Sequence, residues 1–324
     1  ARLSFYLFHT RSLKEMPYAD PFSTLELMHM PFDEQTCILG DNFVLADNFS
    51  GLDSPTDLTA DRGMVPYLTA PNPIKVQFYI VMFCLGGEMR IRLNLAEHNL
   101  RRGDIAVIQP GDIGQWLGVT ADSRIAIMAF TTDFVFPEAD MEGAVVVRKF
   151  LSWNAVVHAS DADMDEFLTI YQSMRRVIRR PGHCYKREAI TGYLQVLHSY
   201  ACQLMAPCVD RLEAQPRTRK KEVFDRFMQL VKENYAHERR IGFYADRLCI
   251  SAKYLSQTVH RVSGRHAGDW IRDYVILEAK ALLRSHRYSV QQVSDMLHFA
   301  NQSFFGAYFK KAVGCSPKTY LNEA

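Results

Sequence analysis

The sequence predicts an α+β protein of several domains: an amino-terminal antiparallel β-barrel, a helical hairpin, and a carboxyl-terminal all-α domain in which a long helix joins two helix-turn-helix units. Three observations predict this class. Short β-forming runs separated by turn residues occupy the first 140 positions, helical spacing of apolar residues follows, and one helix-turn-helix pattern occurs twice near the end. A length of 324 residues is typical of about two globular domains.

The predicted barrel, residues 1–140, is built from runs rich in β-forming residues. Its strands are expected in VQFYIVMFCLGG, MRIRLNL, GDIAVIQPGD and RIAIMAF, which are separated by Gly-Gly, Arg-Arg-Gly-Asp and Pro-Gly. In MRIRLNL the apolar side chains alternate with Arg90, Arg92 and Asn94. One face of that strand is therefore expected to be buried, and the other to face water or a polar cavity.

Residues 141–213 are predicted to form a helical region. Helical spacing is present in DMDEFLTIYQSMRRVI and in KREAITGYLQVLHSYACQLM, and RRPGHC interrupts it, which indicates a hairpin. Ile190, Leu194 and Leu197 share one side of the second helix. This stripe could pack within its own domain, but we expect it to form a two-fold interface, so that the chain is a homodimer.

Residues 214–221 are predicted to be a linker, because Pro216 and a basic cluster separate two helical patterns there. The carboxyl-terminal domain then covers residues 222–324. Residues 217–324 hold 19 Lys and Arg against 10 Asp and Glu, whereas residues 1–216 hold 19 against 26. A basic domain joined to an acidic one predicts a polyanionic partner, with double-stranded DNA as the leading candidate.

Several other protein classes are disfavoured. No run of about 18 apolar residues exists, and the first residues lack the basic, apolar and small-residue order of a signal peptide. The seven cysteines are scattered without C-x-x-C, which argues against a disulfide framework and a zinc site. We therefore expect a cytoplasmic protein that spans no membrane and uses no metal or cofactor.

The stretch ADRLCISAKYLSQTVHRVSG, residues 245–264, has the spacing of a helix-turn-helix unit, which we place at about 241–262. Ala245 is the small residue where two helices cross, and Ser251 is the expected N-cap of the second helix. The apolar contacts are assigned to Leu248, Ile250, Leu255 and Val259. The second helix then has an outer face of polar residues that suits a major groove.

That outer face divides into two kinds of contact. Side chains that can pair with base edges are Lys253, Ser256 and Gln257. Side chains assigned to the DNA backbone are His260, Arg261 and Arg265.

Residues 289–314 repeat this layout, and the second unit is placed at about 289–312. Ser294 takes the small position, 49 residues after Ala245. The apolar contacts are assigned to Val293, Leu297, Phe299 and Phe304, and Asn301, Gln302 and Ser303 open the following helix. Between the units, residues 269–286 are expected to form a helix of roughly 27 Å. One chain could then place two reading helices in major grooves about 34 Å apart.

A first family resemblance concerns GDIAVIQPGDIG, residues 103–114, which is similar to the second motif of the cupin barrels. In that family a histidine three residues after Gly111 would ligate a metal, but this position is Gly114, and residues 78–95 contain no H-x-H. His98 stands alone, so we interpret it as structural. The resemblance therefore implies a barrel that binds a small organic effector rather than a metal. The candidate effector-binding residues at the barrel mouth are Arg90, Arg92 and Trp116.

A second resemblance covers residues 222–321. The motifs ADRL, SxxYLSQ, EAKALL, NQSFF, FKK and SPxxY resemble those of the AraC/XylS family of bacterial transcription regulators. A barrel followed by helices and this domain is also the common order in that family. Leu321 and Tyr274 depart from it, since arginine is frequent at both places. The absence of these two arginines would weaken a backbone contact or a packing salt bridge without undoing the fold.

The AraC/XylS resemblance also implies which residues read bases. In the first unit they are Lys253, Ser256 and Gln257, and in the second unit they are Gln302, Ser303, Gly306 and Ala307. Gly306 and Ala307 offer little beyond apolar contact with a thymine methyl group. The first unit is thus expected to carry most of the specificity. Lys310 and Lys311 are expected to contact the backbone and to supply salt-dependent affinity.

The leading hypothesis is a sequence-specific DNA-binding transcription regulator that responds to a small-molecule effector and has RNA polymerase as a candidate partner. The sequence contains no G-x-S-x-G, H-E-x-x-H or P-loop motif, so we predict no enzyme activity. Two alternatives stay open: a cupin-type enzyme fused to a DNA-binding domain, and a basic helical adaptor that binds protein or RNA. The sequence decides neither the effector and operator nor activation against repression.

Overall fold

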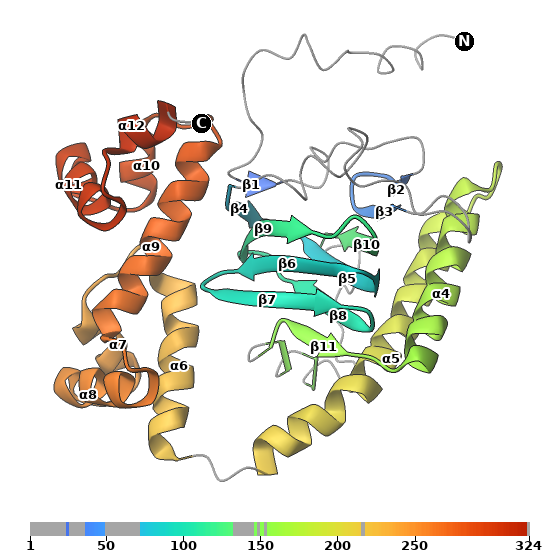
Figure 1. The fold of residues 1–324 in the computed structure, drawn as a ribbon, viewed down its shortest axis with the longest axis horizontal. Coiled ribbons are helices and arrows are strands. Elements are labelled where there is room, and N and C mark those ends of the chain that lie inside the picture. The colour runs from blue at the N-terminus through green and yellow to red at the C-terminus, as the bar shows by residue number, and fades with distance from the viewer. Residues whose placement is uncertain are drawn as a thin grey trace.

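The computed structural model describes residues 24–25, 36–48, 72–131, 146–147, 150–151, 154–214 and 218–322. Two β-sheets form its centre, a pair of helices covers one side of them, and the helices of the carboxyl-terminal domain lie on the other side (Figure 1). Pro216 of the predicted linker lies outside the described residues. So does much of the first 71 positions of the predicted barrel.

The strands form a smaller and a larger sheet. The smaller sheet has the order β1 (Thr24–Leu25), β4 (Ile74–Val76), β9 (Ile113–Val119), β6 (Glu88–Leu93) and β7 (Ala96–Arg101). The larger sheet has the order β11 (Val156–His158), β8 (Asp104–Ile108), β5 (Tyr79–Gly86), β10 (Arg124–Phe130), β3 (Phe43–Asp47) and β2 (Cys37–Leu39). In the described residues β1 and β4 pair in parallel, and the other pairs are antiparallel.

An apolar core fills the space between the two sheets. Met89, Ile91 and Leu93 of β6 are at most 3% exposed and belong to this core, together with residues of β5, β8 and β10 from the opposite sheet. The alternation expected in MRIRLNL is therefore confirmed, and the polar face of β6 is its outer face. The described strands form two facing sheets, so a closed, cupin-like barrel stays a prediction.

A helical hairpin covers the outer face of the larger sheet (Figure 1). It consists of α4 (Asp161–Arg179) and α5 (Lys186–Ala214). The start of α4 is fixed by a capping box, in which Ser160 and Asp163 each satisfy a backbone N–H of the other. The hairpin predicted between the two periodic segments is present in the structure.

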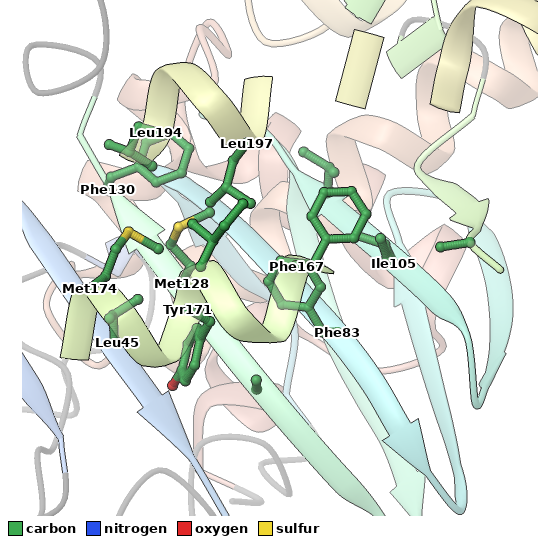
Figure 2. Close-up of a cluster of buried hydrophobic side chains, with 14 of the residues drawn as sticks. Leu45, Phe83, Ile105, Met128, Phe130, Phe167, Tyr171, Met174, Leu194 and Leu197 are labelled. Carbon is green, nitrogen blue, oxygen red and sulfur yellow. The ribbon is translucent and has the colours of Figure 1, made fainter. Parts of the chain in front are cut away.

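The apolar stripe of α5 corrects one expectation. Ile190, Leu194 and Leu197 were expected to form a two-fold interface, but they are 0%, 4% and 7% exposed. They pack in their own chain's second core, between the hairpin and the larger sheet. Figure 2 places Leu194 and Leu197 beside Met128 and Phe130 of β10. These three side chains therefore have no surface left for a partner subunit.

A buried polar cluster also ties the hairpin to the larger sheet. The carboxylate of Asp47, at the end of β3, is fully buried. Tyr171 donates a hydrogen bond of 2.8 Å to it, and Arg175 pairs with the same carboxylate. Burial raises the pKa of Tyr171, and the negative charge of Asp47 adds to this effect. The hydroxyl of Tyr171 and the guanidinium of Arg175 both meet Oδ2 of Asp47, at a place where an isolated charge would be strongly disfavoured.

The carboxyl-terminal domain is all-helical and has a core of its own. Its helices are α6 (Arg219–Asn234), α7 (Ile241–Arg247), α8 (Ala252–Ser263), α9 (Ala267–Arg284), α10 (Val290–Met296), α11 (Gln302–Val313) and α12 (Pro317–Asn322). The long helix α9 runs between the pair α7–α8 and the pair α10–α11 (Figure 1). Within the described chain, no helix is long and apolar enough to cross a membrane.

The two halves touch along the smaller sheet. Lys75 of β4 forms an ion pair of 2.5 Å with Glu278 of α9, and Lys232 of α6 forms one of 2.9 Å with Asp112 before β9. Both carboxylate side chains are only 7% exposed. Leu95, in the β6–β7 turn, packs against the core of the carboxyl-terminal domain. The contact is therefore both apolar and electrostatic.

Candidate nucleic-acid interface

The two helix-turn-helix units share the same turn geometry. After α7, Cys249 adopts a left-handed conformation with φ of 55°, and after α10, His298 does so with φ of 52°. The next residue then bonds back to the small residue: the N–H of Ile250 lies 3.0 Å from the carbonyl of Ala245, and that of Phe299 lies 2.9 Å from the carbonyl of Ser294. Both turns are Schellman motifs, repeated 49 residues apart.

The second helix of each unit also begins and ends in the same way. Ser251 caps α8 by accepting a hydrogen bond from the N–H of Tyr254, and Asn301 caps α11 by accepting one from Phe304. Each helix ends at a left-handed glycine, Gly264 or Gly314. The predicted N-cap of α8 is confirmed, and the repeat is structural as well as sequential.

The inner faces of α8 and α11 hold each unit together. Leu255 and Val259 of α8 are fully buried, as are Phe305 and Phe309 of α11. The expectation that Phe304 is an apolar core contact is wrong, because its side chain is 65% exposed. The second unit has one more residue than the first between the turn and the N-cap of the following helix. The inward-facing positions of α11 are therefore shifted by one residue, and Phe305 is buried instead of Phe304.

The outer faces present the groups predicted to meet DNA. Of the α8 residues predicted to meet DNA, Lys253, Gln257, His260 and Arg261 are exposed, and Ser256 is half-buried. Of the α11 residues predicted to meet DNA, Gln302, Ser303, Ala307, Lys310 and Lys311 are exposed, and Gly306 is half-buried. At helical spacing most of these residues are on the faces away from the core, whereas Gln302 and Gly306 of α11 are nearer to the side of Phe305 and Phe309. Their individual roles at bases or phosphates remain predictions.

Arg265 stands apart from this set. It lies between α8 and α9, where its guanidinium pairs with Asp273 and stacks 4.3 Å above the ring of Trp270. These contacts hold the start of α9 against the end of α8. A contact of Arg265 with a phosphate, as predicted, would therefore have to share the guanidinium with Asp273.

A basic cleft lies where the two halves meet. Its volume is about 870 Å³, and its walls come from the β6–β7 turn, α9 and α11. Arg92 and Leu95 line it from the amino-terminal half, and Lys280 and Lys311 line it from the other half. Burial lowers the pKa of Lys280, and the positive charge of Arg92 adds to this effect. An anion in the cleft would relieve this crowding of cations.

Comparison with known proteins gives matches at both the domain and the chain level. Residues 244–323 match the family model of a helix-turn-helix domain, HTH_18. The chain is 22% identical over 250 residues to the arabinose operon regulatory protein of Salmonella typhimurium, which covers 77% of this chain and 85% of that protein. It is 23% identical over 121 residues to the uncharacterized HTH-type transcriptional regulator YtdP of Bacillus subtilis, over 37% of this chain and 16% of that protein.

Among solved structures, apo ToxT of Vibrio cholerae aligns with a TM-score of 0.38 and 12% identity, over 86% of this chain and 97% of that one. The domain match covers both α8 and α11, and the arabinose operon relative extends the sequence similarity into the amino-terminal half. Residues 244–323 therefore form a helix-turn-helix domain, and the similarity to the arabinose operon regulator agrees with the resemblance to the AraC/XylS family of transcription regulators.

The predicted effector site is not assembled as expected. Arg90 and Arg92 are on the outer face of β6, whereas Trp116 is 6% exposed and belongs to the core between the sheets. Arg92 donates a hydrogen bond of 2.7 Å to Gln115 and lines the basic cleft. Trp116 is paired with Ile91, which faces the core, whereas Arg90 and Arg92 on either side of Ile91 face outward, because neighbouring positions of a strand alternate between its two faces. The three residues therefore do not converge on one ligand.

Two further features bear on ligand chemistry. His98 is partly buried, and this burial lowers its pKa. The part of the chain that the structure describes contains no group of three or more His, Cys, Asp or Glu side chains that could hold a metal ion. Sequence reasoning did not find the basic cleft, because its residues are far apart along the chain and meet only when α9 packs against the β6–β7 turn.

Proposed function

We propose that this protein is a sequence-specific regulator of the AraC/XylS family that places α8 and α11 in successive major grooves of one DNA duplex. The duplication carries the proposal: each unit repeats the turn, the cap and the buried face, and each turns polar or small residues outward. The 18 residues of α9 separate the units. At about 1.5 Å per residue this is roughly 27 Å, close to the groove repeat of about 34 Å once the helix widths are added.

Selection of bound fragments from random-sequence duplexes tests this proposal. We expect an enriched motif of two blocks whose centres lie roughly 10 base pairs apart. The block under α8 should be the more constrained, because Lys253, Ser256 and Gln257 offer more donors and acceptors than Gly306 and Ala307. Equal retention of selected and random duplexes would reject sequence reading, and it would favour an adaptor that binds protein or RNA.

We further propose that the amino-terminal half senses a small organic effector. The basic cleft supports this idea, because a ligand there would contact the β6–β7 turn and α9 together. Its Arg and Lys side chains favour a ligand with an anionic group. A ligand that binds one arrangement of the two halves better than another shifts the equilibrium between them. A second copy of the chain and RNA polymerase are candidate protein partners.

A further inference from the structure

The outer face of α11 carries an exposed aromatic ring that no assigned role uses. Phe304 is 65% exposed, whereas its neighbour Phe305 is fully buried. Burying a phenylalanine side chain is worth about 1.5–3 kcal/mol relative to leaving it exposed. With 65% of its surface exposed, Phe304 gains only part of this in the free protein, so it has apolar surface to offer to a partner.

The local structure fixes where this ring points. Phe304 is the third residue of α11, and its backbone N–H is held by the side chain of the N-cap, Asn301. The first turn of the helix is therefore well ordered. In helix-turn-helix proteins the first residues of the reading helix are those that contact base edges. Phe304 directly follows Ser303 in this first turn, at the end of α11 that would enter the groove.

The ring has free space around it on the helix surface. Phe304, Ala307 and Lys311 follow one another at helical spacing and are all exposed. Ala307 adds only a methyl group, and a Cβ built at Gly306 meets no atom within 4 Å. This stripe of Phe304, Ala307 and Lys311 thus has an apolar side chain at the start of α11 and a cation two turns later. Such an order suits contact with a base edge and then with a phosphate.

The first unit provides a contrast at the same position. Its third helical residue is Tyr254, which is half-buried and carries a hydroxyl group. The outer face of α8 offers Lys253 and Gln257 to base edges, whereas the matching positions of α11, counted from the N-caps, are Ser303 and Ala307, and α11 contains no arginine. The second unit therefore has fewer long polar side chains for reading bases, which favours apolar contact as part of its readout.

We propose that Phe304 is a specificity-determining residue that contacts the C5-methyl group of a thymine in the half-site under α11. Thymine is the base that presents a methyl group in the major groove, and apolar side chains recognise it there. The inference rests on the proposed DNA reading by α11. Lys310 and Lys311, about two turns after Phe304 on the same helix, complement a polyanion, which favours DNA over an apolar protein surface as the occupant.

Replacing single thymines by deoxyuridine tests the contact, because this change removes only the methyl group and keeps base pairing. The probe is the duplex recovered by selection, with each thymine of the α11 half-site changed in turn. One replacement should weaken binding by the wild-type chain about threefold to tenfold, the effect of losing one buried methyl-sized contact. Phe304→Ala should bind the thymine and deoxyuridine duplexes equally, and Phe304→Leu should keep part of the discrimination.

Two controls separate this role from others. Deoxyuridine in the α8 half-site should affect the wild type and Phe304→Ala alike. Phe304→Ala should leave the salt dependence of binding unchanged, whereas Lys311→Ala should reduce its slope by about 1. Far-UV circular dichroism checks that the exposed substitution leaves the helices intact.

Three outcomes would overturn the inference while leaving the proposed function intact. Wild-type binding that ignores every deoxyuridine in the α11 half-site removes the methyl contact. Discrimination that persists in Phe304→Ala assigns it to another residue. Unchanged DNA binding by Phe304→Ala points to a protein partner for the ring. A chain that enriches no sequence at all rejects the proposed function and this contact together.

Discussion

At the scale of single residues, both helix-turn-helix turns hold a residue other than glycine in the left-handed region, Cys249 in one and His298 in the other. This conformation costs an L-residue roughly 1–2 kcal/mol, and glycine avoids most of that at an entropy cost of about 0.5–1 kcal/mol. We expect Cys249→Gly to raise the free energy of unfolding by up to about 1 kcal/mol. Urea unfolding measures the change.

The matched control is Cys249→Ser, which keeps the β-carbon and should give no gain. Both variants should bind DNA as the wild type does, because Cys249 lies in the turn and not on the outer face of α8. Equal stability of the glycine and serine variants would show that the left-handed turn is not strained.

Base reading is argued at the same scale. Gln257 is exposed on the outer face of α8, where its amide can pair with an adenine edge. We expect Gln257→Ala to cost about 1–3 kcal/mol at the selected site and to relax specificity at one base pair. Competition binding with selected and random duplexes measures both effects.

Arg261→Ala is the better control for this prediction than Arg265→Ala. Arg261 is exposed, whereas Arg265 also pairs with Asp273 and stacks on Trp270, so its loss would disturb packing. Arg261→Ala should weaken all duplexes alike. An equal loss of selected and random binding in Gln257→Ala would remove Gln257 from the reading set.

The buried face of α11 shows what sequence reasoning could have found. Counting from the N-caps places Leu255 four residues after Ser251 and Phe305 four residues after Asn301. Aligning the caps would therefore have predicted Phe305 as the core residue, although aligning the small residues favoured Phe304. For α8 the prediction of Leu255 as a core residue is confirmed, because its N-cap, Ser251, directly follows the turn.

At the scale of elements, local signals predicted the helices better than the strands. The hairpin and α7 to α11 follow from periodicity and caps, but β1 to β4, β7, β9 and β11 were not predicted, and β11 lies within the region predicted to be helical. Only Leu100 is buried in β7, and β9 contains Gly114 and Gly118, so neither has the alternating apolar pattern of a strand. The stripe on α5 was correctly seen as apolar, but a stripe does not reveal whether a sheet or a second subunit covers it.

The join between the hairpin and the larger sheet gives a third prediction. Arg175→Ala leaves the buried carboxylate of Asp47 without its cation. Removing one partner of a buried pair costs about 3–5 kcal/mol, so we expect a loss of this order in the free energy of unfolding. Denaturant unfolding followed by far-UV circular dichroism measures it.

Arg176→Ala is the matched control, because Arg176 is the next residue of α4 and is exposed. It should change the free energy of unfolding by no more than about 0.5 kcal/mol. If the two variants were equally stable, Asp47 would be satisfied by other groups, and the cluster would not hold the hairpin in place.

At the scale of the whole molecule, the carboxyl-terminal domain is folded around its own core and touches the other half through Leu95 and a small set of charged groups. Glu278 lies at the centre of this contact. Burial raises the pKa of Tyr235, and the negative charge of Glu278 adds to this effect. Lys75 and Lys232 each reach across to a carboxylate of the opposite half. Such pairs fix how the halves are placed, so the amino-terminal half can influence how α8 and α11 meet DNA.

This arrangement gives the last prediction, which concerns residues 218–324 as an isolated segment. Thr218 caps α6, so the segment begins at a natural helix start and keeps the core of the domain. We expect it to bind the selected duplex. A small organic anion that raises the melting temperature of the full chain and changes its DNA affinity should leave the segment unaffected, because Arg92 and Leu95 of the cleft are gone.

Coupling between two ligands is reciprocal, which supplies the decisive measurement. If the anion changes the DNA affinity of the full chain tenfold, about 1.4 kcal/mol, then DNA must change the affinity for the anion by the same factor. Lys280→Met in the full chain keeps the apolar stem but removes a cleft cation, so it should abolish the response and spare DNA binding. A segment that retained the full response would place the effector site within the carboxyl-terminal domain, and the two sheets would then need a different role.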